Sequence, residues 1–258
     1  MNTNSNVYTV IYTTVIVVVV AAVLAFAASS LKPLQTANIK AETLSQMMTA
    51  AGLGDSESFS DMGNDAVLAT YSENIAEAIV VNARGEQIGV LKTDKDHIEL
   101  IDNFKPENKA ITEGGEPRLP VYKFKSGVTV IPVFGAGLWG PIWGYIALEK
   151  DLKTICGAYF DHSGETPGLG AKIKDEPSFK AQFNGKVLNL QNTKNPFDIV
   201  KGGAPEGSID KVDAISGATM TCNGLDKAID TWVGAYAAYL QSAAPAIQEA
   251  EVAQTVEE

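Results

Sequence analysis

The chain has 258 residues, 45% of them hydrophobic and 20% charged, which allows one substantial core together with a membrane anchor. Its formal net charge is −11 at pH 7, and this argues against nucleic acid as a partner, because nucleic-acid phosphates require a basic surface. The two cysteines, Cys156 and Cys222, and the two histidines lack metal-ligand spacing, so we expect no structural zinc site. A disulfide between the cysteines stays open, because two cysteines cannot establish one.

An uncharged apolar run extends from Val7 to Ala28. It has about the 20 residues that a helix needs to cross a bilayer, so we expect an N-terminal end over 1–6 and a transmembrane helix over 7–28. The alternative is a cleaved signal peptide, because Ala25-Phe26-Ala27 resembles a cleavage site. The length of the run and the absence of Lys and Arg before it favour a retained anchor. Lys32 and Lys40 follow the run, and this count of positive charges places the large domain in the cytoplasm.

Apolar residues then recur at helical intervals and predict an amphipathic helix leaving the membrane over 29–54. The next stretch, 54–75, is rich in Asp, Ser, Gly and Asn and is predicted as a loop with at most one short helix. Two β-hairpins are predicted next, over 78–82 with 87–92 and over 120–125 with 128–134.

The rest of the chain is predicted to hold four further strands, over 143–149, 153–160, 186–190 and 197–200, and a short helix over 178–183. Apolar positions every three or four residues predict a helix over 223–243 with one buried face. These elements indicate an α+β fold, a mainly antiparallel sheet with flanking helices, preceded by one N-terminal transmembrane helix. The folded domain would cover 55–243, and an acidic, Ala-rich tail over 244–258 would be frayed or disordered.

The segment Gly135-Ala-Gly-Leu-Trp-Gly140 has the form G-x-G-x-x-G after a predicted strand. A dinucleotide-binding fingerprint requires a helix after the last glycine, whereas Pro141 leads into another strand pattern. We therefore reject a dinucleotide site. The segment is predicted either as a loop that lets a flat aromatic ligand approach the backbone or as a tight turn with Trp139 and Trp143 in the core.

The stretch 162–170, HSGETPGLG, has three glycines and no apolar alternation, which predicts a loop. Glu165 and Thr166 could donate or accept hydrogen bonds at a polar ring edge, and Gly168 and Gly170 would allow close approach. A plain connection between elements is the alternative. The histidine of this loop has no identifiable partner for acid–base catalysis, and the elbow motif of serine hydrolases is absent.

The stretch 213–224, DAISGATMTCNG, gathers hydroxyl and small residues just before the predicted C-terminal helix. It could be an ordinary helix start, since Ser and Thr are good N-caps. It could also be a phosphate site, because the N–H groups at a helix N-terminus favour an anion.

Three motifs together resemble a known family: Asp213-Ala-Ile-Ser-Gly-Ala-Thr219, the run from Gly137-Leu-Trp-Gly140 to Gly144-Tyr145, and Glu165-Thr-Pro-Gly-Leu-Gly170. With the apolar N-terminal run, the chain resembles the family of C subunits of the sodium-translocating NADH:quinone reductase, which carry FMN covalently. The likeness covers nearly the whole chain, and the motifs occur in the family's order.

The resemblance implies that Thr219 bears the FMN phosphate as a phosphoester, with Asp213, Ser216, Gly217 and Ala218 completing the motif and Thr221 beside the phosphate. Other residues implied to bind the flavin are Leu138, Trp139, Glu165, Thr166, Gly168, Leu169 and Gly170. The FMN would do the redox chemistry, so no residue is implied as catalytic and the chain would not be catalytic alone.

The resemblance also implies a bacterial inner-membrane protein with its FMN-binding domain, 55–243, on the extracytoplasmic side, against the count of lysines. It would be an electron carrier in a membrane complex of six subunits that couples NADH oxidation and quinone reduction to Na⁺ export. Because an unactivated threonine is a poor nucleophile, attachment would require a flavin transferase.

Three alternatives stay open. One is the G subunit of an Rnf-type complex, which carries a similar covalent FMN but moves electrons between ferredoxin and NAD. The second is a membrane-tethered binding or assembly module without cofactor. The third is a secreted flavoprotein that acts alone, which would require cleavage after Ala27.

Overall fold

The computed structural model describes residues 6–92, 97 and 104–256, and the chain divides into two units, Met1–Glu42 and Thr43–Glu258. The predicted N-terminal end, 1–6, lies outside the described residues at 1–5. Of the predicted tail, 244–258, residues 244–256 belong to the C-terminal helix, and 257–258 lie outside the described residues. The two units are described separately.

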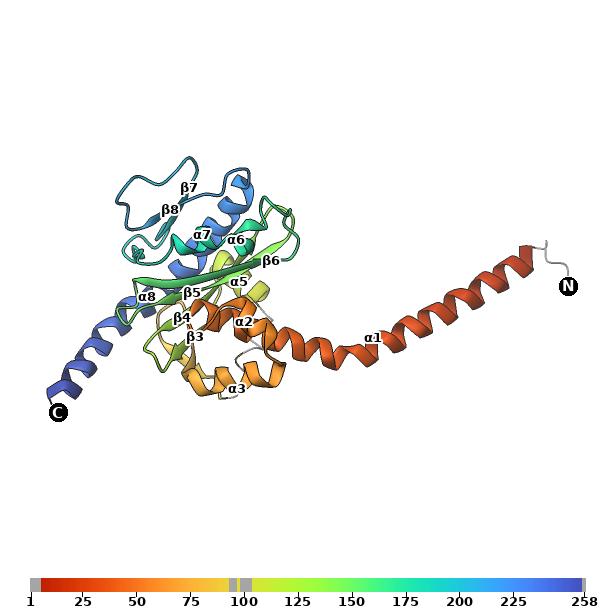
Figure 1. Cartoon of the computed structure of the whole chain (residues 1–258), viewed down its shortest axis with the longest axis horizontal. Helices are drawn as coiled ribbons and strands as arrows, with labels where there is room; N and C mark the ends of the chain where they lie inside the picture. The colour runs from red at the N-terminus through yellow and green to blue at the C-terminus, as the bar shows by residue number, and fades with distance from the viewer. Residues whose placement is uncertain (1–5, 93–96, 98–103, 257–258) are drawn as a thin grey trace. The chain divides into compact units, whose positions relative to one another are not determined.

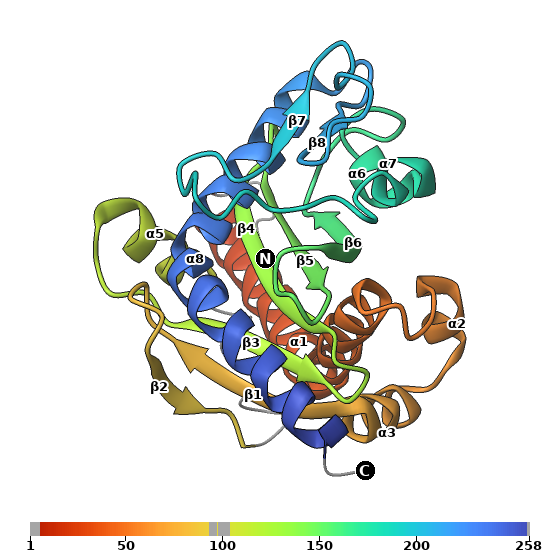
Figure 2. The ribbon, with the colours of Figure 1, turned by 90° about the vertical axis from the view of Figure 1, so that its left-hand side faces the viewer.

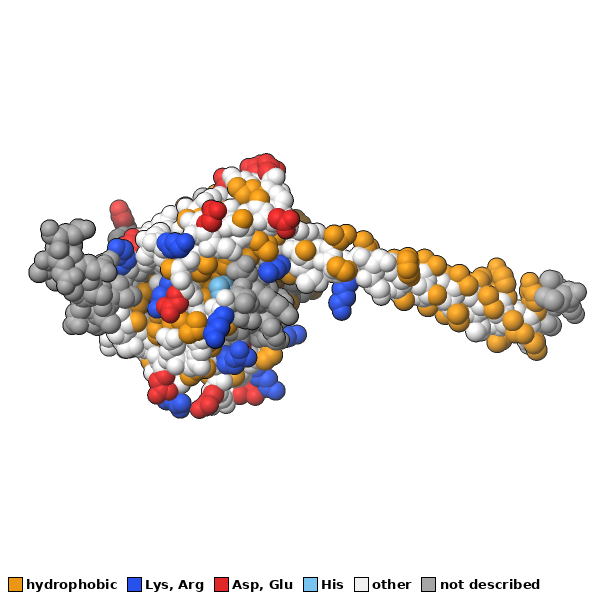
Figure 3. Space-filling view, turned by 90° about the horizontal axis from the view of Figure 1, so that it is seen from below, with side chains coloured by type: hydrophobic (Ala, Val, Ile, Leu, Met, Phe, Trp, Pro, Cys, Tyr) orange, Lys and Arg blue, Asp and Glu red, His pale blue; other side chains and the backbone are white. Residues whose placement is uncertain are grey.

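Helix α1, Asn6–Ala50, makes up the described part of the first unit, and its last turns belong to the second (Figure 1). Among the described residues it alone is long and apolar enough to cross a membrane, with a mean hydropathy of 2.8 over its most apolar 18 residues. Exposed hydrophobic side chains follow one another along its N-terminal part (Figure 3). The predicted helices 7–28 and 29–54 are continuous in the structure, with Pro33 inside the helix.

The second unit is built on a six-stranded antiparallel sheet in the order β2-β1-β3-β4-β5-β6 (Figure 2). The strands are β1 (Ile75–Val81), β2 (Gln87–Val90), β3 (Leu119–Phe124), β4 (Thr129–Ala136), β5 (Pro141–Leu148) and β6 (Ile155–His162). Both predicted hairpins and the predicted strands over 143–149 and 153–160 are confirmed. The α+β class with a mainly antiparallel sheet is confirmed as well.

Helix α8, Thr219–Val256, crosses one face of the sheet over β4 (Figure 2). The contact is close because a Cβ on Gly135 of β4 would lie 2.7 Å from the Cβ of Ala228. Side chains of neighbouring strand residues point to opposite faces. On the other face, Trp143 of β5 and its register partner Asp161 of β6 contact Gln46 in the last turns of α1. Both faces of the sheet are therefore covered.

The shorter helices are α2 (Ser56–Asp61), α3 (Asn64–Asn74), α5 (Phe104–Glu113), α6 (Lys172–Asp175) and α7 (Pro177–Ala181). The prediction of a loop with at most one short helix over 54–75 is wrong, because α2 and α3 lie there. The polar residues of this stretch are typical of a loop, but one of them caps α2: the Asp55 carboxylate accepts a hydrogen bond from Ser58 N at 2.7 Å. Helix α7 confirms the short helix expected over 178–183.

The prediction of a strand over 186–190 is wrong. Its backbone makes one isolated bridge, Thr154 with Val187, and then donates to separate segments, from Val187 N to Ile209 O and from Asn189 N to Pro196 O. The predicted strand over 197–200 corresponds to β7 (Asp198–Val200), which pairs in parallel with β8 (Lys211–Asp213) as a separate ribbon. Strand β8 was not predicted.

Candidate functional site

The stretch 213–219 forms a compact turn between β8 and α8. The turn closes through a hydrogen bond from Ala218 N to Ile215 O at 3.1 Å, and Gly217 has a φ of +81°, which disfavours any residue with a Cβ. The Sγ of Cys222 accepts a hydrogen bond from Ile215 N at 3.3 Å. The turn is thus fixed from within and from the helix that follows.

Thr219 is the first residue of α8, four residues before the predicted helix start at 223. The first N–H groups of a helix have no acceptor inside it and carry the positive end of the helix dipole. Thr219 is half-buried, Ser216 and Gly217 are exposed, and Ala218 is buried. The hydroxyl of Thr219 therefore lies at the start of a helix, at a place suited to an anion.

Asp213, the first residue of the motif, forms hydrogen bonds with segments outside this turn. Its Oδ1 accepts a hydrogen bond from Ala204 N at 2.6 Å, and its N–H donates to Gln182 Oε1 at 2.8 Å. These bonds fix the end of β8 to a neighbouring loop and to the residue that follows α7. The structure therefore gives Asp213 a positioning role for the turn.

The carboxylate of Glu165 joins three segments of the site. Its Oε2 accepts a hydrogen bond from Thr221 Oγ1 in the first turn of α8 at 2.6 Å, and its Oε1 accepts one from Trp139 N in the β4–β5 turn at 2.9 Å. Glu165 and Thr221 are 5% and 2% exposed. The loop 162–170, the turn 137–140 and the start of α8 are thus held together by one buried side chain.

The turn 137–140 joins antiparallel strands and closes through Gly137 N to Gly140 O at 2.8 Å. Strand β5 begins at Pro141, directly after this turn, as the sequence predicts. The alternative of a tight turn with both tryptophans in the core is wrong for Trp139, which is 69% exposed beside exposed Leu138. Leu169, on the loop 162–170, is also exposed, as are Thr166 and Gly168.

A second buried carboxylate closes the base of the loop 162–170. The Oδ2 of Asp161 accepts hydrogen bonds from Lys174 Nζ at 2.8 Å and from Gln46 Nε2 at 3.0 Å. His162 Nδ1 accepts a hydrogen bond from Glu165 N at 3.1 Å, which gives this ring a structural role. Three residues of this site were not predicted from the sequence, because each belongs to an ordinary helix or strand pattern: Gln46, Asp161 and Lys174.

The two cysteines, Cys156 and Cys222, are free. Burial raises the pKa of both thiols. The disulfide that the sequence left open is therefore not formed.

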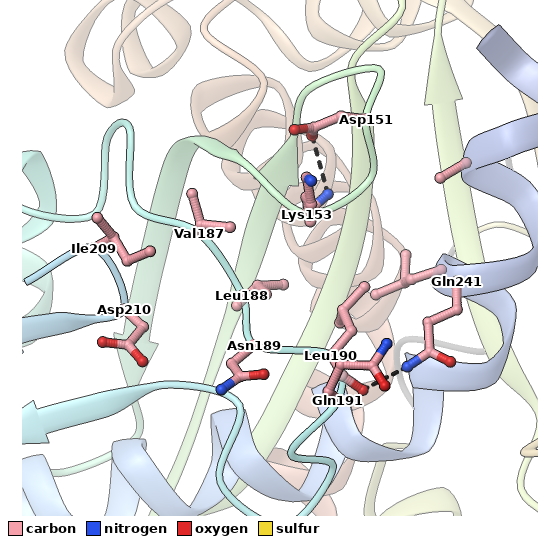
Figure 4. A pocket seen from close by; sticks show the side chains of 12 residues that line it. Asp151, Lys153, Val187, Leu188, Asn189, Leu190, Gln191, Ile209, Asp210 and Gln241 are labelled. Carbon is pink, nitrogen blue, oxygen red and sulfur yellow. Dashed lines mark hydrogen bonds between the residues drawn. The ribbon is translucent and has the colours of Figure 1, made fainter.

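A pocket of about 580 Å³ opens elsewhere in this unit (Figure 4). It lies by the β5–β6 turn, at the end of β5 opposite to the turn 137–140, and no motif residue lines it. Its lining combines apolar side chains of 187–190 and α8 with amides and carboxylates such as Asn189, Gln241 and Asp210. This pocket is therefore separate from the site around Thr219.

Comparison with known proteins shows which family the chain resembles and over which residues. Residues 137–234 match the FMN-binding domain family, a range that holds the turn 137–140, the loop 162–170 and Thr219. The C subunit of the Na⁺-translocating NADH-quinone reductase of Vibrio campbellii is 34% identical over 221 residues, 82% of this chain and 84% of that protein. The chain belongs to this family of C subunits.

The same subunit of Pseudomonas aeruginosa is 31% identical over 250 residues, 90% of this chain and 93% of that protein. The crystal structure of the subunit from Parabacteroides distasonis matches with a TM-score of 0.66 and 32% identity, over 81% of this chain and 96% of that one. The resemblance seen in the sequence is therefore confirmed, and the Rnf-type alternative is not favoured. Membership of this family also confirms that the chain is one subunit of an oxidoreductase complex.

Proposed function

We propose that this chain is the membrane-anchored electron carrier of a Na⁺-translocating NADH-quinone reductase and that it holds FMN covalently, through a phosphoester to Thr219 Oγ1. One observation carries the attachment: Thr219, the last residue of the motif, is the first residue of α8 and is half-buried, inside the range that matches the FMN-binding domain.

The residues around Thr219 fit a flavin phosphate. The N–H groups and dipole at the start of α8 favour a negative group by on the order of 0.5 kcal/mol when exposed. Exposed Ser216 and Gly217 leave the approach to Thr219 open, whereas Thr221 is buried with its hydroxyl on Glu165. These contrasts support Thr219 as the attachment point and Thr221 as its neighbour.

The walls for the flavin ring are proposed to come from the turn 137–140 and the loop 165–170. Their exposed apolar side chains, Leu138, Trp139 and Leu169, can cover a flat aromatic group, and Thr166, Gly168 and Gly170 complete the loop. Bound FMN supplies the electron transfer. The chain's own residues bind it, orient it and hold the two walls at a fixed spacing through Glu165.

Family membership supports a proposal about the partners of the chain and its place in the cell. We propose attachment by a separate flavin transferase, five further subunits in the complex, and an extracytoplasmic position of the FMN-binding domain in the bacterial inner membrane. The span 7–28 has no ionisable side chain other than Tyr8 and Tyr12, and an ion pathway through a membrane requires polar or charged groups. Sodium is therefore expected to cross through other subunits.

Mass spectrometry of the peptide that contains Thr219 tests the attachment. The chain made in a bacterium that has a flavin transferase is expected to carry an added FMN mass there and to fluoresce on a denaturing gel. Thr219→Ala should abolish the fluorescence, whereas Thr221→Ala should keep it. A labelled Thr219→Ala variant would refute the site, and a bare Thr219 in the wild-type chain would favour the cofactor-free module.

A further inference from the structure

The Glu165 carboxylate is held in one orientation at the centre of the site. Each of its oxygens accepts one hydrogen bond, from the backbone of Trp139 and from the hydroxyl of Thr221. Donors thus face both oxygens, as they do around a carboxylate, which accepts hydrogen bonds and cannot donate them. The chain therefore fixes a negative charge where the turn 137–140, the loop 162–170 and α8 meet.

Two glycines make the room for this charge. A Cβ on Gly137 would collide with Glu165 Oε1, and a Cβ on Gly170 would lie 2.5 Å from Glu165 Oε2 and from Thr221 Oγ1. Neither glycine has a positive φ, so the close approach of the carboxylate, and not the backbone conformation, requires a glycine at both positions. Glycine at positions 137 and 170 thus leaves the space that this carboxylate occupies.

The charge of Glu165 has no cationic partner in the part of the chain that the structure describes. Both of its hydrogen-bond donors are neutral, and the nearby Lys174 forms its salt bridge with Asp161. Charge interactions are stronger and less screened in a buried site than in water. A flavin held between the turn 137–140 and the loop 165–170 would therefore lie within the field of Glu165.

We propose that the Glu165 carboxylate lowers the reduction potential of the FMN held at Thr219. This inference rests on the proposed function. A flavin that gains electrons becomes more negative, and a fixed negative charge beside it disfavours that change. The carboxylate, held in place by Trp139 N and Thr221 Oγ1, acts through its charge, which requires no hydrogen bond to the ring. The flavin is thereby a stronger electron donor than it would be with a neutral side chain here.

The test is a potentiometric titration of the full, FMN-loaded chain with Glu165→Gln. Glutamine has the same shape, keeps an acceptor for Trp139 N, and can donate its amide hydrogen to Thr221 Oγ1. We expect a more positive midpoint potential, seen as a several-fold rise in the ratio of reduced to oxidised flavin at a fixed solution potential. Glu165→Met, which also lacks charge at similar volume, should shift the potential in the same direction.

The matched control is Glu149→Gln, which removes one charge from an exposed position at the far end of β5. That end is about 25 Å from the turn 137–140, because eight strand residues rise about 3.3 Å each. Glu149→Gln should therefore leave the reduction potential of the flavin unchanged. Equal potentials in wild type and Glu165→Gln, or a shift as large in Glu149→Gln, would overturn the inference. Loss of FMN from both Glu165 variants would also overturn it, since Glu165 would then serve attachment. A wild-type chain without FMN would instead refute the proposed function itself.

Discussion

Thr219 and Thr221 carry the same chemical group two residues apart, and the fold treats them differently. Thr221 is 2% exposed and donates its hydroxyl hydrogen to Glu165. Thr219 begins the helix and is half-buried. The proposed flavin transferase could therefore reach the hydroxyl of Thr219 and not that of Thr221. The motif alone does not show this difference, because it depends on Glu165, 56 residues away along the chain.

Asp230 on α8 is expected to make the folded state more stable at low pH. Burial first, and then the neighbouring carboxylates Asp226 and Asp198, raises the pKa of Asp230 from its ordinary 3.8 to about 7. The unfolded chain loses this proton near pH 4 while the folded chain keeps it to about pH 7, so the free energy of unfolding falls between these values. Asp230→Asn should remove this fall and stabilise the fold above pH 7 by on the order of 1 kcal/mol, after allowing for solvent screening.

Urea unfolding of Asp230→Asn and wild type between pH 4 and 8 checks this prediction. The groups that face Asp230 also titrate or carry charge: Asp226 accepts a hydrogen bond from Ile199 N, and Asp198 pairs with Lys211. Glu73→Gln, at an exposed carboxyl on α3, is the matched control. An equal gain at pH 4 and pH 8 would contradict the proton linkage and indicate a packing effect.

Site residues that belong to a sequence motif could be predicted, whereas site residues that are brought together from distant segments could not. Thr219, Glu165 and Gly170 are recognisable because small, hydroxyl and turn-forming residues cluster around them. Gln46 and Lys174 are not, because a buried glutamine on a helix and a lysine on a short helix look like surface residues. Only the tertiary structure brings both to Asp161.

Among the elements, α8 positions the attachment point, and its contact with β4 depends on a glycine. A Cβ on Gly224 would collide with the carbonyl oxygen of Ala136. Alanine is favoured over glycine in a helix by about 1 kcal/mol, but here the backbone clash is expected to win. Gly224→Ala should destabilise the domain by about 1–3 kcal/mol, the usual cost of overpacking, and lower its melting temperature.

Asn223→Ala is the control for Gly224→Ala, since Asn223 is exposed in the same turn of α8. It tests helix propensity without the clash, and a small gain or no change in melting temperature is expected. If both variants stabilised the domain equally, α8 would not be held against β4 at this point. The start of α8 would then be positioned by Glu165 and the 213–219 turn alone.

Elements with local signals were predictable, whereas those held by distant partners were not. The hairpins of β1 with β2 and of β3 with β4 follow from alternating apolar residues around short turns. The stretch 186–190 has the same apolar character, but its backbone groups bond to three separate segments. Helix α3 was missed because its polar composition resembles a loop, although Val67 and Tyr71 are buried.

At the scale of the whole molecule, the part of α1 before residue 40 and the core of the second unit do not share buried side chains. Most hydrophobic side chains of α1 before residue 40 are exposed, which suits a lipid environment, and none of them is in the buried core. The last turns of α1 differ, because Leu44, Met47 and Met48 are fully buried there. One continuous helix thus contains the membrane segment and a part of the domain core.

Two truncated chains are expected to behave differently for this reason. A chain that starts at Thr43 keeps the whole second unit and should be soluble with a cooperative thermal transition. A chain that starts at Gly52 loses Gln46 and four buried apolar side chains, namely Ala50 and the larger Leu44, Met47 and Met48. Losing one buried Leu or Met costs about 2–5 kcal/mol, so three such losses reach the total stability of about 5–15 kcal/mol that a domain has. Circular dichroism melts of the two chains give the comparison, and a cooperative transition at the same temperature in both would show that α1 is an anchor alone.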